Sequence, residues 1–100
     1  MGAWNTFVEG DNLAVMTGLE PGSVDLIYTD PPYNTGHGFA YVDDFRGPDG
    51  ARGGRHQAWV DFMRPRLLAM REVLASSGAM FISIDDNEQA RLRLLMDEVF

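Results

Sequence analysis

Two nearly continuous apolar runs, VDLIYT at 24–29 and AMFISI at 79–84, most constrain the fold of this 100-residue chain. Runs of this length are typical of strands in a parallel sheet whose two faces are both covered. Between them, apolar residues recur at helical spacing on one face: Trp59, Met63, Leu67, Met70 and Leu74. A strand, a helix and a strand in this order predict a parallel pair joined by a right-handed crossover. The two runs should be the most buried strands.

The segments before and after these runs extend the alternation of strands and helices. TFVE predicts a short strand, and Leu13, Met16 and Leu19 then predict a helix with Asn12 as its N-cap. The pattern stops after one more helix, so it resembles part of a larger doubly wound domain. The sequence predicts an α/β fold with three parallel strands, near residues 5–9, 24–29 and 79–84.

The two later helices carry their own boundary signals. The first should begin at Gln57 and end at SSG (76–78), with Pro65 inside it as a kink or restart, because proline lacks a backbone donor. The second should begin at Asp86, which with Gln89 resembles a capping box. Its apolar face consists of Leu92, Leu95, Met96 and Val99.

Composition and charge exclude several classes of protein. The chain has no cysteine, so it has neither disulfides nor thiolate metal sites. It lacks an apolar run long enough to span a membrane and a signal peptide, which predicts a cytoplasmic protein. Its net charge is −7, whereas a free-standing nucleic-acid binder is usually basic. If the chain acts on DNA, most phosphate contacts must come from elsewhere.

The segment DPPYNTG at 30–36 follows the first apolar run directly. Ligands of open parallel sheets bind beyond the carboxyl ends of the strands, which is where this segment should lie. Asp30 and Pro31 each precede a proline and are therefore held extended. Neither Pro31 nor Pro32 has an N–H, so nearby carbonyls lack local donors and are free to face a ligand. The segment presents a carboxylate, a carbonyl and the ring of Tyr33.

Such a set suits a planar base that carries an exocyclic amine. The Asp30 carboxylate and the Pro31 carbonyl would accept the two N–H bonds of the amine, while Tyr33 would stack on the ring. An aryl amine is a poor nucleophile because its lone pair is delocalised. Hydrogen bonds that favour a tetrahedral nitrogen would direct that pair toward an electrophile. Inside a duplex the amine is hard to reach, so the base must be flipped out.

These residues resemble the catalytic motif of amino-group DNA methyltransferases. The flanking text resembles the permuted subgroup that includes the modification subunits of type III restriction systems. The similarity covers nearly the whole chain except 46–57, and its stretches are FVEGDNL, VDLIYTDPPYNTG, YVDDF, WVDFMRPRL and GAMFISIDDNEQARLRLLMDEVF.

The resemblance implies a partial Rossmann-like, three-layer fold with S-adenosylmethionine as methyl donor. It implies an enzyme that methylates the N6 amine of a flipped-out adenine at specific sites in double-stranded DNA, because aspartate in the first motif position is more typical of adenine enzymes. A restriction subunit and a second copy of the full-length chain are the protein partners that it suggests. Alternatives are a cytosine N4 enzyme, an RNA or protein amine methyltransferase, and an inactive remnant. By match, the catalytic residues are Asp30, Pro31, Pro32 and Tyr33, and the cofactor contacts are Asp11, Asn12 and Asp30.

Two features of the family are missing from the sequence. The Gly-rich cofactor loop is absent, since GHG at 36–38 follows no strand and opens no helix, and no target-recognition domain is visible. Residues 1–100 are therefore expected to be the N-terminal part of an N-4/N-6 DNA methylase catalytic domain, inactive alone.

Several polar residues have plainer explanations beside the functional ones. For Asp11, a role as helix cap and a contact with the cofactor are about equally good explanations. No metal site is expected. Surface or helix-end roles are expected for Asp43, Asp44, Asp85, Asp86, Glu88, His37 and His56, while a phosphate contact and a surface loop are equally good explanations of Arg52 and Arg55.

Overall fold

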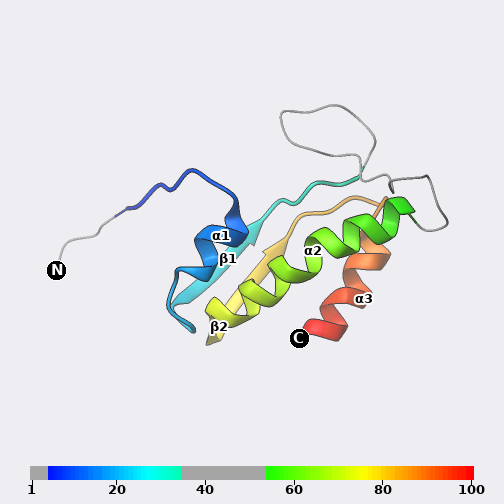
Figure 1. The fold of residues 1–100 in the computed structure, drawn as a ribbon. Coiled ribbons are helices and arrows are strands. Elements are labelled where there is room, and N and C mark those ends of the chain that lie inside the picture. The colour runs from blue at the N-terminus through cyan, green and yellow to red at the C-terminus, as the bar shows by residue number, and fades with distance from the viewer. Residues whose placement is uncertain (1–4, 35–53) are drawn as a thin grey trace.

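The computed structural model describes residues 5–34 and 54–100. Its elements are α1 (Asn12–Thr17), β1 (Val24–Thr29), α2 (Gly54–Val73), β2 (Leu74–Ile82) and α3 (Gln89–Val99) (Figure 1). β1 and β2 pair in parallel, and α2 lies between them in the chain. The predicted α/β fold and the parallel pairing of the two apolar runs are confirmed.

The prediction of a third strand near residues 5–9 is wrong. These residues form no strand and extend away from the sheet, where the Phe7 side chain is 92% exposed (Figure 1). Strand propensity alone does not order so short a segment, because a strand needs a hydrogen-bonded neighbour and a face to bury. In the described part of the chain the sheet therefore has two strands instead of three.

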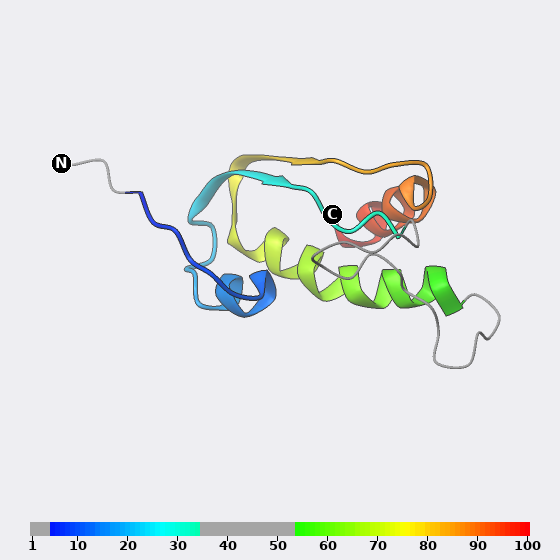
Figure 2. The ribbon, with the colours of Figure 1, turned by 90° about the horizontal axis from the view of Figure 1, so that it is seen from above.

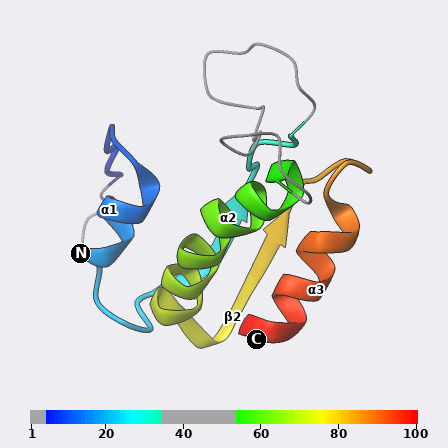
Figure 3. The ribbon, with the colours of Figure 1, turned by 45° about the vertical axis from the view of Figure 1, so that its right-hand side comes forward.

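The helices lie on one side of the sheet, so the described residues form two layers and not three (Figures 2 and 3). Ile27 and Met80 are register partners and pack against the core, whereas their neighbours Tyr28 and Phe81 are 72% and 59% exposed. Side chains alternate between the faces of a strand, so covering one face leaves every second residue in solvent. The prediction that both runs are covered on both faces is therefore wrong for the described residues, although both runs are more buried than residues 5–9, as predicted.

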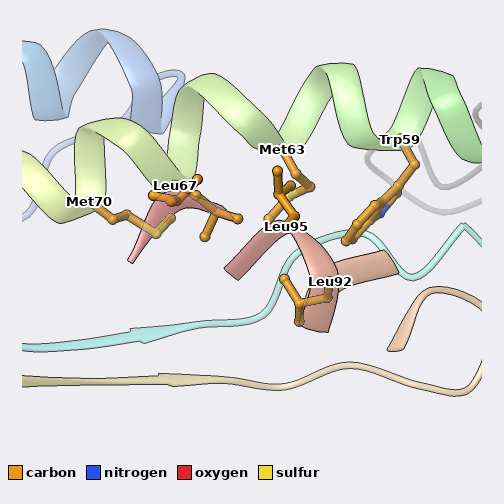
Figure 4. Close-up of a cluster of buried hydrophobic side chains, with 7 residues drawn as sticks. Trp59, Met63, Leu67, Met70, Leu92 and Leu95 are labelled. Carbon is orange, nitrogen blue, oxygen red and sulfur yellow. The ribbon is translucent and has the colours of Figure 1, made fainter. Parts of the chain in front are cut away.

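The core lies between the sheet, α2 and α3. Trp59, Met63, Leu67 and Met70 are buried as predicted, and Figure 4 shows them pointing from α2 toward α3 and the strands. Leu92, Leu95 and Val99 meet them from α3. Burial of one such side chain contributes about 1.5–3 kcal/mol, so this contact holds the two helices on the sheet.

β2 begins earlier than predicted. α2 ends at Val73 and β2 starts at Leu74, so SSG lies inside the strand and does not end the helix. Val24 pairs with Leu74 but Leu26 pairs with Ala79, so β2 contains a bulge between these pairs. A Cβ on Gly78 would lie 2.7 Å from the Leu74 Cδ1 atom and 3.0 Å from the Asp25 carbonyl oxygen. Gly78 is therefore the residue that lets the bulge pack against β1.

The helix starts also differ from the predicted ones. Asp11, not Asn12, caps α1, because its carboxylate accepts a hydrogen bond from the Leu13 N–H at 3.0 Å. Asp86 does not cap α3, whose N-cap position is held by Glu88 without a side-chain cap hydrogen bond. α2 begins at Gly54, three residues before Gln57, and continues through Pro65 without a restart.

Candidate active site

The DPPY segment leaves the sheet at the carboxyl end of β1, as predicted. β1 ends at Thr29 and Asp30 follows it directly with an exposed side chain. The Ser83 N–H, just beyond β2, donates to the Thr29 carbonyl oxygen at 3.0 Å. The ends of the two parallel strands are thereby tied together, and the segment starts from a fixed point at the edge where ligands of such sheets bind.

The two prolines differ in their surroundings. Pro31 is buried and Pro32 is half-buried. The Trp59 indole N–H donates to the Pro32 carbonyl oxygen at 2.7 Å. The expectation that the local carbonyls are free of protein donors is thus wrong for Pro32, because α2 brings an indole to it. The role of the Pro31 carbonyl as an acceptor for a ligand stays a prediction.

Tyr33 is anchored at its hydroxyl group. The Tyr33 and Ser83 hydroxyl oxygens lie 2.8 Å apart. The Ser83 hydroxyl acts to lower the pKa of the Tyr33 phenol, whereas the Asp30 carboxylate and loss of hydration act to raise it, and the pKa lies above its ordinary value of 10.0. The phenol therefore stays neutral near pH 7. A contact between Tyr33 and Ser83, the residue that follows β2, was not predicted.

A polar cluster, which we call the Asn34 cluster, lies next to Tyr33 and has two buried members, Asn34 and Glu88. It contains Asn34, Arg55, His56 and Glu88. Asn34 is fully buried and has a left-handed backbone with φ of 64°, which asparagine adopts more readily than most residues. Its Nδ2 atom lies 2.6 Å from the Glu88 Oε2 atom and 3.1 Å from the Arg55 carbonyl oxygen.

The remaining contacts of the Asn34 cluster join three parts of the chain. The Arg55 guanidinium donates to the Asn34 carbonyl oxygen. The His56 Nδ1 atom lies 3.0 Å from both carboxylate oxygens of Glu88. The end of the DPPYN segment, the first turn of α2 and the start of α3 therefore meet at one point. Glu88 stands at the N-terminus of α3 as expected, but its side chain is buried and bound to Asn34. Arg55 and His56 lie in the first turn of α2 and not in a loop.

Asp11 and Asn12 lie at the start of α1 and are both bound by Arg66 of α2. Arg66 Nη2 is 3.0 and 3.1 Å from the two Asp11 carboxylate oxygens, and its Nε is 3.1 Å from Asn12 Oδ1. The hydrogen bond from the Leu13 N–H, with the nearby Arg66, holds the pKa of Asp11 below its usual value. The hydrogen bonds that the structure gives to Asp11 and Asn12 thus go to α1 and α2, and not to the DPPY segment.

Other candidates named from the sequence carry no structural account. His37, Asp43, Asp44, Arg52 and the glycines of GHG lie outside the described residues. Within residues 5–34 and 54–100, no group of three His, Asp or Glu side chains is arranged to hold a metal ion. Across the same residues, no helix combines the length and the apolar character that crossing a membrane requires.

The fold and site together define a parallel α/β unit that presents an acid, two prolines and an aromatic ring at the carboxyl end of a strand. The model of a family described as DNA methylase matches residues 24–100, which include both strands, α2 and α3. The chain belongs to this DNA methylase family.

Curated relatives agree with this assignment. The StyLTI Mod subunit of a type III restriction-modification enzyme from Salmonella typhimurium is 44% identical over 96% of this chain and 18% of its own length. The type II methyltransferase M.KpnI from Klebsiella pneumoniae is 42% identical over 91% of the chain and 22% of its own length. The DNA adenine methyltransferase YhdJ from Escherichia coli is 32% identical over 77% of the chain and 24% of its own length. The chain thus spans less than a quarter of the length of these relatives.

Proposed function

We propose that this chain supplies the amine-binding part of a site-specific DNA methyltransferase that methylates the N6 amine of a flipped-out adenine. The observation that carries the proposal is the DPPY segment, which leaves β1 with Asp30 exposed and with the Pro32 carbonyl held by Trp59. Membership of the DNA methylase family supports the reaction class. A Rossmann-like fold in the whole protein is part of the same proposal.

The Asp30 carboxylate and the Pro31 carbonyl act as the two acceptors for the amine. Trp59 takes one of the two acceptor positions of the Pro32 carbonyl, which favours the preceding carbonyl as the acceptor for the amine. Two acceptors placed off the plane of the base favour a tetrahedral nitrogen, whose lone pair is then available to an electrophile. Acceptors that bind the amine more strongly as charge develops stabilise the transition state over the ground state.

Tyr33 supports the flipped base by stacking, a contact worth about 1–3 kcal/mol per base. Its hydroxyl is occupied by Ser83, and its raised pKa keeps the phenol neutral. The residue is therefore suited to present a ring face and does not serve as a base. Anchoring of the hydroxyl reduces the rotamer freedom that the ring would otherwise lose on binding.

S-adenosylmethionine supplies a methyl group on a positively charged sulfur, which is an electrophile toward the amine nitrogen. Asp11, Asn12 and Asp30 are the residues that we assign to this donor. Leu13 and Arg66 make three contacts with the Asp11 carboxylate, which has about four acceptor positions, so capacity remains for a hydroxyl group. The free acceptor capacity of the Asp11 carboxylate therefore fits a ribose hydroxyl group of S-adenosylmethionine.

α2 connects the proposed donor and base sites. Trp59 contacts the DPPY segment and Arg66 contacts Asp11 and Asn12. Seven residues of an α-helix span about 10 Å, which is a suitable spacing for two adjoining ligands. A single rigid element thus fixes both sites relative to each other.

Adenine is the favoured acceptor, and double-stranded DNA the favoured substrate, because one relative carries the name of a DNA adenine methyltransferase and two others are restriction-modification or type II enzymes. The Mod subunit relatives also support a restriction subunit as partner. A homodimer of the whole protein and a cytoplasmic location remain predictions.

The test is to express the full-length gene in a host that lacks DNA methylation and to analyse nucleosides from its DNA by mass spectrometry. We expect N6-methyladenine with the wild-type gene and none with Asp30→Ala. Asp97→Asn, which changes an exposed acid on α3, is the matched control and should retain methylation. N4-methylcytosine, or no methylated base, would contradict the proposal.

A further inference from the structure

Glu88 is buried in a way that its position at the start of α3 does not explain. Its side chain is 0% exposed, and it makes no cap hydrogen bond to the helix. An ionised carboxylate is costly to bury unless it is paired and hydrogen-bonded. An exposed glutamate at an N-cap position would gain from the helix dipole without that cost. The burial of Glu88 therefore serves something outside α3.

The contacts of Glu88 lead to the segment that we assign to the amine. The carboxylate lies 2.6 Å from Asn34 Nδ2, 3.0 Å from His56 Nδ1 and 4.0 Å from Arg91 Nε. His56 belongs to α2, so its contact joins α2 to the start of α3, whereas Arg91 lies three residues further along α3 itself. The short contact with Asn34 is different, because Asn34 directly follows Tyr33.

Asn34 has the conformation that makes such an anchor necessary. A positive φ costs energy in a residue with a side chain, and it persists when the surroundings over-determine it. Both the amide and the carbonyl of Asn34 are held, the amide by Glu88 and Arg55 and the carbonyl by Arg55. On the other side of Tyr33, Trp59 holds the Pro32 carbonyl. Tyr33 is therefore flanked by two fixed residues.

We infer that Glu88 is a positioning residue for methyl transfer: it holds Asn34 in its left-handed conformation and thereby sets the pose of Tyr33 against the target base. This inference rests on the proposed function. In this role Glu88 acts through Asn34 and contacts neither the target base nor the methyl donor. A purely structural role, fastening α3 to α2, would instead make Glu88 important for folding and indifferent to the chemical step.

The experiment uses the full-length protein and compares Glu88→Gln with Glu98→Gln. Glu98 lies on the same helix, pairs with Arg64 and is 57% exposed, so it is the matched control. Glutamine keeps the size of the side chain but loses one acceptor and the charge at Asn34. We expect kcat to fall on the order of 10²-fold, the loss known for small misplacements near reacting groups, with little change in donor affinity or thermal midpoint. The control should stay near wild type.

A second pair of variants tests the step through Asn34 without altering Glu88. Asn34→Gly keeps access to a positive φ, whereas Asn34→Ala does not. We expect kcat to be lower in Asn34→Ala than in Asn34→Gly, and Glu88→Gln to add little to Asn34→Ala because both changes remove one interaction. The comparison of Asn34→Gly with Asn34→Ala tests the left-handed conformation at Asn34 even if Glu88→Gln fails to fold.

The outcomes separate this inference from the proposed function. An active wild type, an inactive Asp30→Ala and a fully active Glu88→Gln would overturn the role of Glu88 alone. Equal kcat values for Asn34→Gly and Asn34→Ala would also overturn the role of Glu88. The same holds if Glu88→Gln loses donor affinity and thermal midpoint in parallel with kcat. A wild-type protein without methyl transfer would overturn both.

Discussion

Replacing Trp59 with phenylalanine should loosen the DPPY segment as well as the core. Trp59 is fully buried, and its indole N–H lies 2.7 Å from the Pro32 carbonyl oxygen. Phenylalanine keeps an aromatic ring there but has no donor. The half-buried carbonyl would lose its partner at a cost of about 1–3 kcal/mol. The space left by the smaller ring adds about 24 cal/mol per Å³, so the total should be about 2–4 kcal/mol.

The loss of stability and the loosening of the DPPY segment are both measured in the full-length protein. Urea unfolding by circular dichroism gives the loss in free energy of unfolding, and hydrogen exchange at the Tyr33 and Asn34 amides reports the segment itself. Met63→Leu is the matched control, because Met63 is equally buried and a volume-conserving change costs less than about 1.5 kcal/mol. Equal stability of the two variants, with unchanged exchange at Tyr33, would refute the role assigned to the indole hydrogen bond.

Three further outcomes follow from particular contacts. Gly78→Ala should destabilise by about 1–3 kcal/mol in a thermal melt, because its Cβ would meet the Asp25 carbonyl oxygen at 3.0 Å; a neutral effect would contradict the packing of the bulge. Tyr33→Phe should keep most methyl transfer and Tyr33→Ala should lose it, since stacking needs only the ring; equal losses would show that the bond to Ser83 is what matters. The lowered pKa of Asp11 means that its contribution to stability is complete above its usual pKa of 3.8 and is lost as the pH falls through the lower folded value; Asp11→Asn should remove this acid-side loss in melts recorded from pH 5 down to about 2.

Local patterns were enough to predict the pairing and the core. The bounds of β1 and the buried face of α2 both follow from runs and spacings within one element. The prediction of a strand near residues 5–9 was wrong because a strand forms only beside a hydrogen-bonded neighbouring strand, which no local pattern reveals. The exposed outer face of the sheet depends likewise on which elements cover it.

In the candidate site, too, local features could be predicted from the sequence and long-range contacts could not. DPPY could be placed at the end of a strand from sequence, because proline geometry is local. Glu88 could not be recognised as a buried anchor, because its partner Asn34 is 54 residues away in the chain. The one available signal was Asn34 itself, a residue type that tolerates a left-handed backbone after a rigid segment.

The most direct test of the central claim is the single-turnover rate of methyl transfer by full-length Asp30→Asn, measured beside its affinity for S-adenosylmethionine. Asparagine keeps the shape of Asp30 but offers one acceptor without charge. We predict a rate lower by on the order of 10²-fold or more, with a much smaller change in donor affinity, because the carboxylate acts mainly on the amine in the transition state. A wild-type rate, or a loss fully accounted for by weaker donor binding, would contradict the assignment of Asp30 to the amine.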